Sequence, residues 1–261
     1  MFFIDVQGTL IDDSKKPIDG AVKFIEKLNL DNIPYVVVTN NTKQESDKFL
    51  EYLNSIGFQI SKHRYLDPLM ILDEVVSEKS CLAFGTTQFL SLLENRGYEI
   101  HSKSPKYILL GVKHDYTAEE FSNIIETLLS NPDTQLIGMH GTSTYMKHGK
   151  RYPGVGAILE MLKFATGRDY RVVGKPSDIF YQKALEKIGA DSFREITMVS
   201  DDFKGDLQGA KELGMKIVLV LSGKIKSIDE VVERPDIYIP KLSTKLFQYN
   251  IEIDNRRREN G

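Results

Sequence analysis

Short apolar runs alternate with helical patterns in the first part of the chain. Two runs rich in β-branched and aromatic residues, Phe2–Val6 and Tyr35–Val38, predict strands. Each is followed by an amphipathic stretch, Ala21–Leu30 and Phe49–Ile56, and Gly57 is suited to end the second helix. Strands that are apolar throughout and separated by helices are typical of a parallel sheet covered on both faces. The beginning of the chain therefore predicts the order β-α-β-α.

The same order returns toward the end of the chain, and the middle has strands and helices of its own. The later strands are predicted at Tyr170–Val173, Ile196–Val199, Lys216–Leu221 and Asp236–Ile239, with helices at Asp178–Ile188 and Leu207–Leu213. The middle strands are predicted at Cys81–Phe84, Tyr107–Leu110 and Thr134–Met139, with helices at Phe89–Leu93, Ala118–Leu129 and Val155–Phe164. We predict an α/β protein with a Rossmann-like parallel-sheet core domain (residues 1–65 and 170–261) and an inserted, smaller α/β cap domain (residues 66–169).

Composition narrows the classes of protein to consider. Of the 261 residues, 41% are hydrophobic and 27% are charged, which is typical of a folded globular protein. The net charge of −3 gives no basic excess for nucleic acid or an anionic membrane, and the one basic run, Arg256-Arg257-Arg258, is interpreted as a solvated tail. A single cysteine, Cys81, excludes an internal disulfide and favours a cytoplasmic location. No pattern isolates a self-complementary surface, so a homo-oligomer stays open.

Polar side chains suited to phosphoryl transfer follow four of the predicted strands. They are Asp5 with Gln7-Gly8-Thr9, Thr39 with Asn40, Lys175, and Asp201 with Asp206. Ligands of an open parallel sheet bind at the carboxyl ends of its strands. Carboxylates bind Mg²⁺ and can attack phosphorus, whereas lysine and hydroxyl groups hold phosphoryl oxygens. Taken singly, each is commonly a turn, cap or surface residue, but together they predict a common site.

These segments resemble the four motifs of the haloacid dehalogenase (HAD) superfamily, and within it the NagD-like phosphatases with an inserted α/β cap. Asp5-Val6-Gln7-Gly8-Thr9-Leu10 resembles DxDGT(L), Thr39-Asn40-Asn41-Thr42 the second motif, Gly174-Lys175-Pro176-Ser177 the third, and Asp201 through Asp206 the fourth, GDxxxxD. Phe84-Gly85-Thr86 and Pro153-Gly154-Val155-Gly156-Ala157 resemble cap segments. The resemblance covers nearly the whole chain.

The resemblance implies Mg²⁺-dependent hydrolysis of a small phosphate monoester, with Asp5 as the nucleophile. It implies that the metal is held by Asp5, the main-chain carbonyl of Gln7 and Asp201, with Asp206 supporting Lys175 or a metal-bound water. It implies further that Thr39, Asn40 and Lys175 hold the phosphoryl group of a small phosphorylated metabolite, and that the cap selects this substrate.

Two residues depart from the family pattern. Ser200 stands where glycine is usual, and its small size predicts little effect. Gln7 stands where the phosphatases have an aspartate that acts as general acid and base, and glutamine cannot ionise. A slow phosphatase, a substitute acid such as Asp202, transfer to another acceptor, and a protein that only binds a phosphorylated ligand or acts as a regulatory partner all stay open.

The segment Met139–Gly149 is the candidate for substrate recognition in the cap. It holds His140, Thr142 and Tyr145, and loops on a rigid scaffold often carry function. A solvated loop without a role is the alternative. The substrate itself, whether a sugar phosphate, a nucleotide or a cofactor phosphate, cannot be predicted from these residues.

Overall fold

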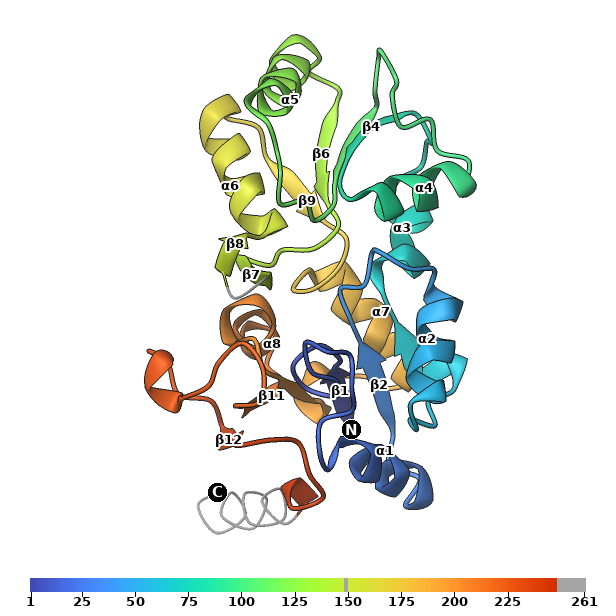
Figure 1. Ribbon diagram of the computed structural model, residues 1–261, viewed down its shortest axis with the longest axis vertical. Coiled ribbons are helices and arrows are strands. Elements are labelled where there is room, and N and C mark those ends of the chain that lie inside the picture. The colour runs from blue at the N-terminus through green and yellow to red at the C-terminus, as the bar shows by residue number, and fades with distance from the viewer. Residues whose placement is uncertain (148–149, 248–261) are drawn as a thin grey trace. The chain divides into compact units, whose positions relative to one another are not determined.

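The computed structural model describes residues 1–147 and 150–247, which form two compact α/β units. One unit consists of Met1–Val38, Leu50–Tyr65 and the described residues from Ala184 on, and the other of Thr39–Phe49 and Leu66–Lys183. Both are coloured by residue number in Figure 1. The basic run Arg256-Arg257-Arg258 and the last two residues of the candidate cap loop lie outside the described residues.

A six-stranded sheet in the order β12-β11-β10-β1-β2-β3 organises the first unit. Its strands are β1 (Phe2–Asp5), β2 (Tyr35–Val38), β3 (Tyr65–Leu66), β10 (Thr197–Ser200), β11 (Lys216–Val220) and β12 (Ile237–Ile239). The strand β1 pairs in parallel with β10 and with β2, and β11 pairs in parallel with β10 and β12. Phe3 and Ile4 are fully buried, because β1 lies inside the sheet. Asp5 is thus at the carboxyl end of a buried strand.

The helix α1 (Ala21–Leu30) shows why the first unit folds as its sequence predicts. Its apolar residues recur at helical spacing, and Phe24, Ile25 and Leu28 are fully buried. The ring of Phe24 meets that of Phe2 edge-on, with 5.9 Å between the ring centroids. Other helical segments between or after strands of this sheet include α2 (Ser46–Ser55), α7 (Asp178–Ile188), a π-helical turn (Phe203–Leu207) and α8 (Gln208–Glu212).

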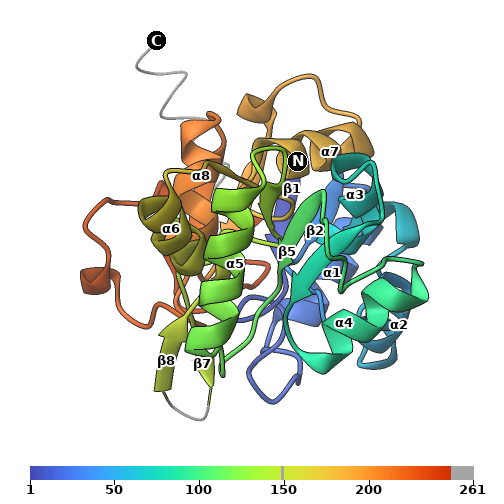
Figure 2. The ribbon, with the colours of Figure 1, turned by 90° about the horizontal axis from the view of Figure 1, so that it is seen from above.

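A four-stranded parallel sheet in the order β4-β5-β6-β9 organises the second unit. Its strands are β4 (Cys81–Phe84), β5 (Tyr107–Leu110), β6 (Gln135–Gly138) and β9 (Tyr170–Val172), and its helices are α3 (Pro68–Val75), α4 (Thr87–Asn95), α5 (Ala118–Ser130) and α6 (Val155–Thr166). Figure 2 shows α5 and α6 side by side. Ile108 of β5, Leu128 of α5 and Leu159 of α6 are fully buried in the shared core.

Two expectations about the second unit were wrong. The strand that begins at Tyr170 was expected in the sheet of Asp5, but it pairs with β6, with Tyr170 opposite Leu136. It is a partly exposed edge strand, unlike the buried strands around β1. The expected loop over 139–149 contains a strand, β7 (Thr144–Lys147), which pairs antiparallel with β8 (Lys150–Pro153).

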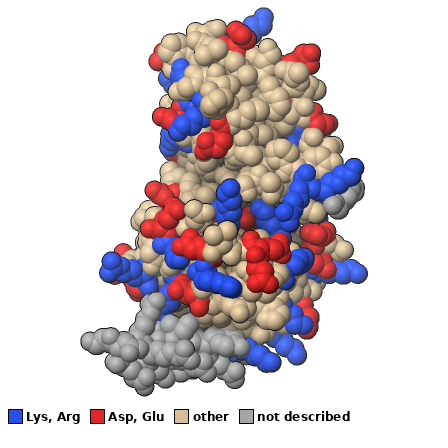
Figure 3. Space-filling view, turned by 90° about the vertical axis from the view of Figure 1, so that its left-hand side faces the viewer, with Lys and Arg blue, Asp and Glu red and all other residues tan. Residues whose placement is uncertain are grey.

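On the face drawn in Figure 3, Lys and Arg side chains lie among Asp and Glu side chains. Among the residues that the structure describes, no helix combines the length and the apolar character needed to cross a membrane.

Phe24→Ala should lower the free energy of unfolding by about 3–5 kcal/mol, because it leaves a cavity in the core of the first unit. Phe164→Ala is the matched control, since that ring is 93% exposed and its loss should change stability by less than about 0.5 kcal/mol. Chemical denaturation measures both. Equal effects of the two substitutions would contradict the assignment of Phe24 to the core.

Candidate active site

The chain reverses direction immediately after Asp5. The carbonyl of Val6 accepts hydrogen bonds from the N–H groups of Leu10 (2.8 Å) and Thr9 (3.3 Å), and Gly8 has the positive φ of 79° that such a turn favours in glycine. The turn returns Thr9 toward Asp5, so that the threonine hydroxyl donates to Oδ2 of the aspartate at 3.3 Å. Asp5 is 4% exposed. The turn therefore presents one oxygen of a buried carboxylate to a hydroxyl group.

The carboxylate of Asp201 lies between two glycines. A Cβ atom on Gly8 would lie 2.2 Å from Oδ2 of Asp201, and one on Gly223 would lie 1.9 Å from the same oxygen. The main-chain N–H of Lys224 donates to this oxygen as well. No sequence motif indicated the segment Gly223-Lys224, although it follows the end of β11 (Lys216–Val220) in the same sheet.

Burial and the nearby charge of Asp5 raise the pKa of Asp201 well above its usual range. The charges of Asp202 and Asp206 act in the same direction, whereas the N–H of Lys224 opposes them. A divalent cation would remove this repulsion, and carboxylate oxygens are the ligands that Mg²⁺ prefers. The donor set of this part of the first unit therefore fits the implied metal.

The described residues contain no group of three or more His, Cys, Asp or Glu side chains arranged to hold a metal ion. A Mg²⁺ ion here would depend on two carboxylates, with a main-chain carbonyl and water completing its shell, which suits an ion that commonly keeps several waters. Asp5 and Asp201 are the carboxylates that fit this role. The assignment of Gln7 and Asp206 as ligands stays a prediction.

The hydroxyl of Ser200 takes part in two hydrogen bonds. It donates to Oδ2 of Asp206 at 2.7 Å and accepts from the N–H of Asp202 at 3.1 Å. Asp202 in turn accepts the N–H of Gly205 (2.9 Å) and pairs with the ammonium of Lys224 (2.7 Å). These bonds fix the turn after β10 and orient the Asp206 carboxylate.

Three predicted phosphate-binding residues lie in the second unit. Thr39 and Lys175 are buried, with exposed fractions of 0% and 1%. The main-chain N–H of Lys175 donates to Oδ1 of Asn40 at 2.9 Å, and the hydroxyl of Thr39 accepts the N–H of Asn41 at 3.2 Å. The structure thus brings Asn40 and Lys175 together, although 135 positions separate them in the sequence.

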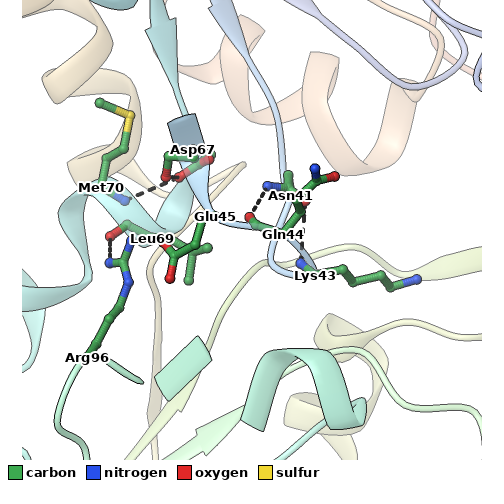
Figure 4. A network of polar contacts seen from close by, with 9 residues as sticks. Asn41, Lys43, Gln44, Glu45, Asp67, Leu69, Met70 and Arg96 are labelled. Atoms are coloured by element: carbon green, nitrogen blue, oxygen red, sulfur yellow. Dashed lines mark hydrogen bonds and ion pairs between the residues drawn. The ribbon is translucent and has the colours of Figure 1, made fainter. Parts of the chain in front are cut away.

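Polar contacts hold the loop that follows Asn40 (Figure 4). The side-chain amide of Asn41 donates to the carbonyl of Gln44 at 2.7 Å. Glu45 forms an ion pair with Arg96 at 3.0 Å, and Arg96 also donates to the carbonyl of Leu69 at the start of α3. The loop that begins at Thr39 is therefore fixed to α3 and to the end of α4.

The candidate cap residues occupy two places in the second unit. His140 is buried, and with Thr142 it flanks Gly141, whose N–H donates to the carbonyl of Lys175 at 2.9 Å. Tyr145 lies in β7, where its ring stacks on the tyrosine opposite in β8 at 5.7 Å between centroids. His140 and Thr142 are thus close in sequence to a contact with Lys175, while Tyr145 belongs to the hairpin.

Comparisons with known proteins decide the family. Residues 2–99 match the family described as haloacid dehalogenase-like hydrolase, and residues 172–245 match a second, described as HAD-hydrolase-like. The chain belongs to the haloacid dehalogenase-like hydrolases. The resemblance drawn from the four motifs is confirmed.

Relatives support this assignment over most of the chain. The acid sugar phosphatase of Staphylococcus aureus is 27% identical over 235 residues, which cover 88% of this chain and 89% of that protein. The p-nitrophenyl phosphatase of Archaeoglobus fulgidus has a similar fold, with a TM-score of 0.78, 23% identity and coverage of 92% and 95% of the two chains. NagD of Escherichia coli K-12 gives a TM-score of 0.73 at 21% identity, with coverage of 93% and 96%. The predicted α/β fold of the NagD type is confirmed.

Gly223→Ala should weaken Mg²⁺ binding by about tenfold or more, because the added methyl group displaces a carboxylate that would contact the ion directly. Gly189→Ala is a control for lost stability, since its left-handed backbone (φ 71°) makes the replacement costly while its methyl group meets open space and does not reach Asp201. Titration calorimetry measures both affinities. An unchanged Mg²⁺ affinity in Gly223→Ala would argue against Asp201 as a ligand.

Proposed function

We propose that this HAD-family phosphatase hydrolyses a small phosphate monoester in a Mg²⁺-dependent reaction through an aspartyl-phosphate at Asp5. The observation that carries the proposal is that Asp5 and Asp201 are both buried in the first unit, where the charge of Asp5 helps to raise the pKa of Asp201. The relative named acid sugar phosphatase supports a phosphorylated sugar or a similar small metabolite as the substrate.

Each step of the proposed reaction uses a group of this chain. An oxygen of Asp5 attacks phosphorus, the bond from phosphorus to the leaving oxygen breaks, and that oxygen takes up a proton from water. Water then attacks the phosphorus of the acyl phosphate, which releases phosphate and restores the Asp5 carboxylate. Mg²⁺, when bound, neutralises charge on the phosphoryl oxygens. We assign Thr39 and Lys175 to the phosphoryl group, with Lys175 supplying positive charge and the side chain of Asn40 bound to the Lys175 main chain.

Gln7 limits the rate of this reaction. Its side chain is exposed and cannot give or take a proton in the way a carboxyl group does. General acid–base catalysis contributes about 10²–10⁴-fold. Asp202 is a poor substitute acid, because its two oxygens accept hydrogen bonds from Gly205 and Lys224. The enzyme should therefore prefer substrates whose leaving group departs without protonation.

The cap residues His140, Thr142 and Tyr145 are proposed to contact the leaving group. His140 and Thr142 adjoin the Gly141 contact with Lys175, which supports a place near the phosphoryl-binding residues of the second unit. The alternative function is a protein that binds a phosphorylated ligand without turnover, or a regulatory partner. Gln7 is the observation that favours this alternative.

The wild-type protein should release phosphate from p-nitrophenyl phosphate only when Mg²⁺ is present. Asp5→Asn should abolish this release, because an amide cannot form the acyl phosphate, and its fold should persist. Phosphate and p-nitrophenol are measured together, with circular dichroism as the check on folding. Activity that survives in Asp5→Asn would remove Asp5 as the nucleophile, and an inactive wild type that still binds Mg²⁺ and phosphate would favour the binding protein.

Gln7→Asp should raise kcat for an unactivated alkyl phosphate by about 10²-fold or more, since it supplies the missing acid and base. The gain should be smaller for p-nitrophenyl phosphate, whose leaving group needs little protonation. Gln7→Asn is the matched control, because it shortens the side chain equally but keeps it neutral. If Gln7→Asp and Gln7→Asn have equal rates, the glutamine does not limit turnover.

A further inference from the structure

The side chain of Asn40 binds the main chain of Lys175 at two points. Its Oδ1 accepts the N–H of Lys175 at 2.9 Å, and its Nδ2 donates to the carbonyl of the same residue at 3.4 Å. Asparagine carries one acceptor and one donor group on a short, planar side chain, so it can satisfy both main-chain groups of a single residue. The Asn40 amide thus bonds both the N–H and the carbonyl of Lys175, as a neighbouring strand would.

The surroundings of Lys175 are built for this contact. A Cβ atom on Gly174 would lie 2.6 Å from Oδ1 of Asn40, so only glycine at this position allows the amide to approach. The carbonyl of Lys175 accepts a further hydrogen bond from the N–H of Gly141 at 2.9 Å. The main chain of a lysine that is only 1% exposed is therefore held from two segments distant in sequence.

We propose that Asn40 is a positioning residue, which acts on the phosphoryl group through Lys175 instead of binding that group itself. This inference rests on the proposed function, because it assigns Lys175 to the phosphoryl group. Four rotatable bonds separate the ammonium of a lysine from its main chain. Any movement of the main chain therefore adds to the movement of the charge, and a fixed main chain helps to keep the ammonium in one place. A displacement of about 1 Å can lower a rate about 10²-fold.

A double-mutant cycle separates this role from direct binding. Asn40→Ala should lower kcat/KM for p-nitrophenyl phosphate by about 10–100-fold, because the ammonium of Lys175 is no longer aimed. In the Lys175→Met background the same substitution should change kcat/KM by less than about twofold, since residues that act as a unit are not additive. Effects that multiply in the double variant would overturn the proposal, because a direct ligand acts independently of Lys175.

The chain supplies a matched control for lost stability. Asn54 binds the main chain of Ile60 in the same way, with both hydrogen bonds at 2.9 Å, and neither residue is predicted for the site. Asn54→Ala should change kcat/KM by the same small factor in the wild-type and Lys175→Met backgrounds. If Asn54→Ala shows the coupling to Lys175 expected of Asn40→Ala, the cycle reports stability and the proposal fails.

Hydrogen exchange tests the contact without any activity. The amide hydrogen of Lys175 should exchange about tenfold faster in Asn40→Ala, because it loses its acceptor. Asn40→Asp keeps an acceptor oxygen and should restore slow exchange. Unchanged exchange at Lys175 in Asn40→Ala would overturn the proposal. If the wild type releases no phosphate, the proposed function fails, and slow exchange that depends on residue 40 would still establish the contact.

Discussion

The repulsion between two buried carboxylates, Asp5 and Asp201, is the constraint on which the first unit depends. A buried β1 places Asp5, and the neighbouring β10 leads to Asp201. Burial and the charge of Asp5 raise the pKa of Asp201, so a proton or a cation at this place relieves the repulsion. The glycines at positions 8 and 223 leave room for the Asp201 carboxylate, and no side chain could replace either hydrogen without moving it. A bound divalent cation would relieve the repulsion between the two carboxylates.

Much of the fold can be predicted because its central strands are apolar on both faces. The bounds predicted for α1, β2 and α7 match the structure, since a buried run or an amphipathic stretch determines each of them locally. The sheet of β9 could not be predicted in this way. Its pairing with β6 depends on a register between segments far apart in sequence, and its own residues are only partly buried. The hairpin of β7 and β8 was missed because its strands are short and partly polar.

Some features of the candidate site can be predicted from the sequence, and others depend on contacts between distant segments. Carboxylates and hydroxyls at strand ends are visible in the sequence, and the family confirmed by the comparisons is the one that these motifs indicate. Contacts between distant segments are not visible. The two hydrogen bonds from Asn40 to Lys175 and the place of Gly223 against Asp201 depend on tertiary structure. The hydrogen bond from the Ser200 hydroxyl to Asp206 likewise depends on how the chain folds after β10. The size of a buried polar side chain does not show which hydrogen bonds it makes, although nearly every buried polar group has a hydrogen-bond partner.

Gln7 should make the aspartyl-phosphate open to direct observation. A side chain that cannot activate water should slow the second step more than the first, so that the phosphorylated enzyme accumulates. The most direct measurement is acid quench of the wild-type protein during turnover of p-nitrophenyl phosphate with Mg²⁺, followed by mass spectrometry of the peptide Met1–Lys15. The expected result is a phosphoryl group on Asp5 that hydroxylamine removes. Steady turnover with an unmodified peptide at every quench time would contradict it.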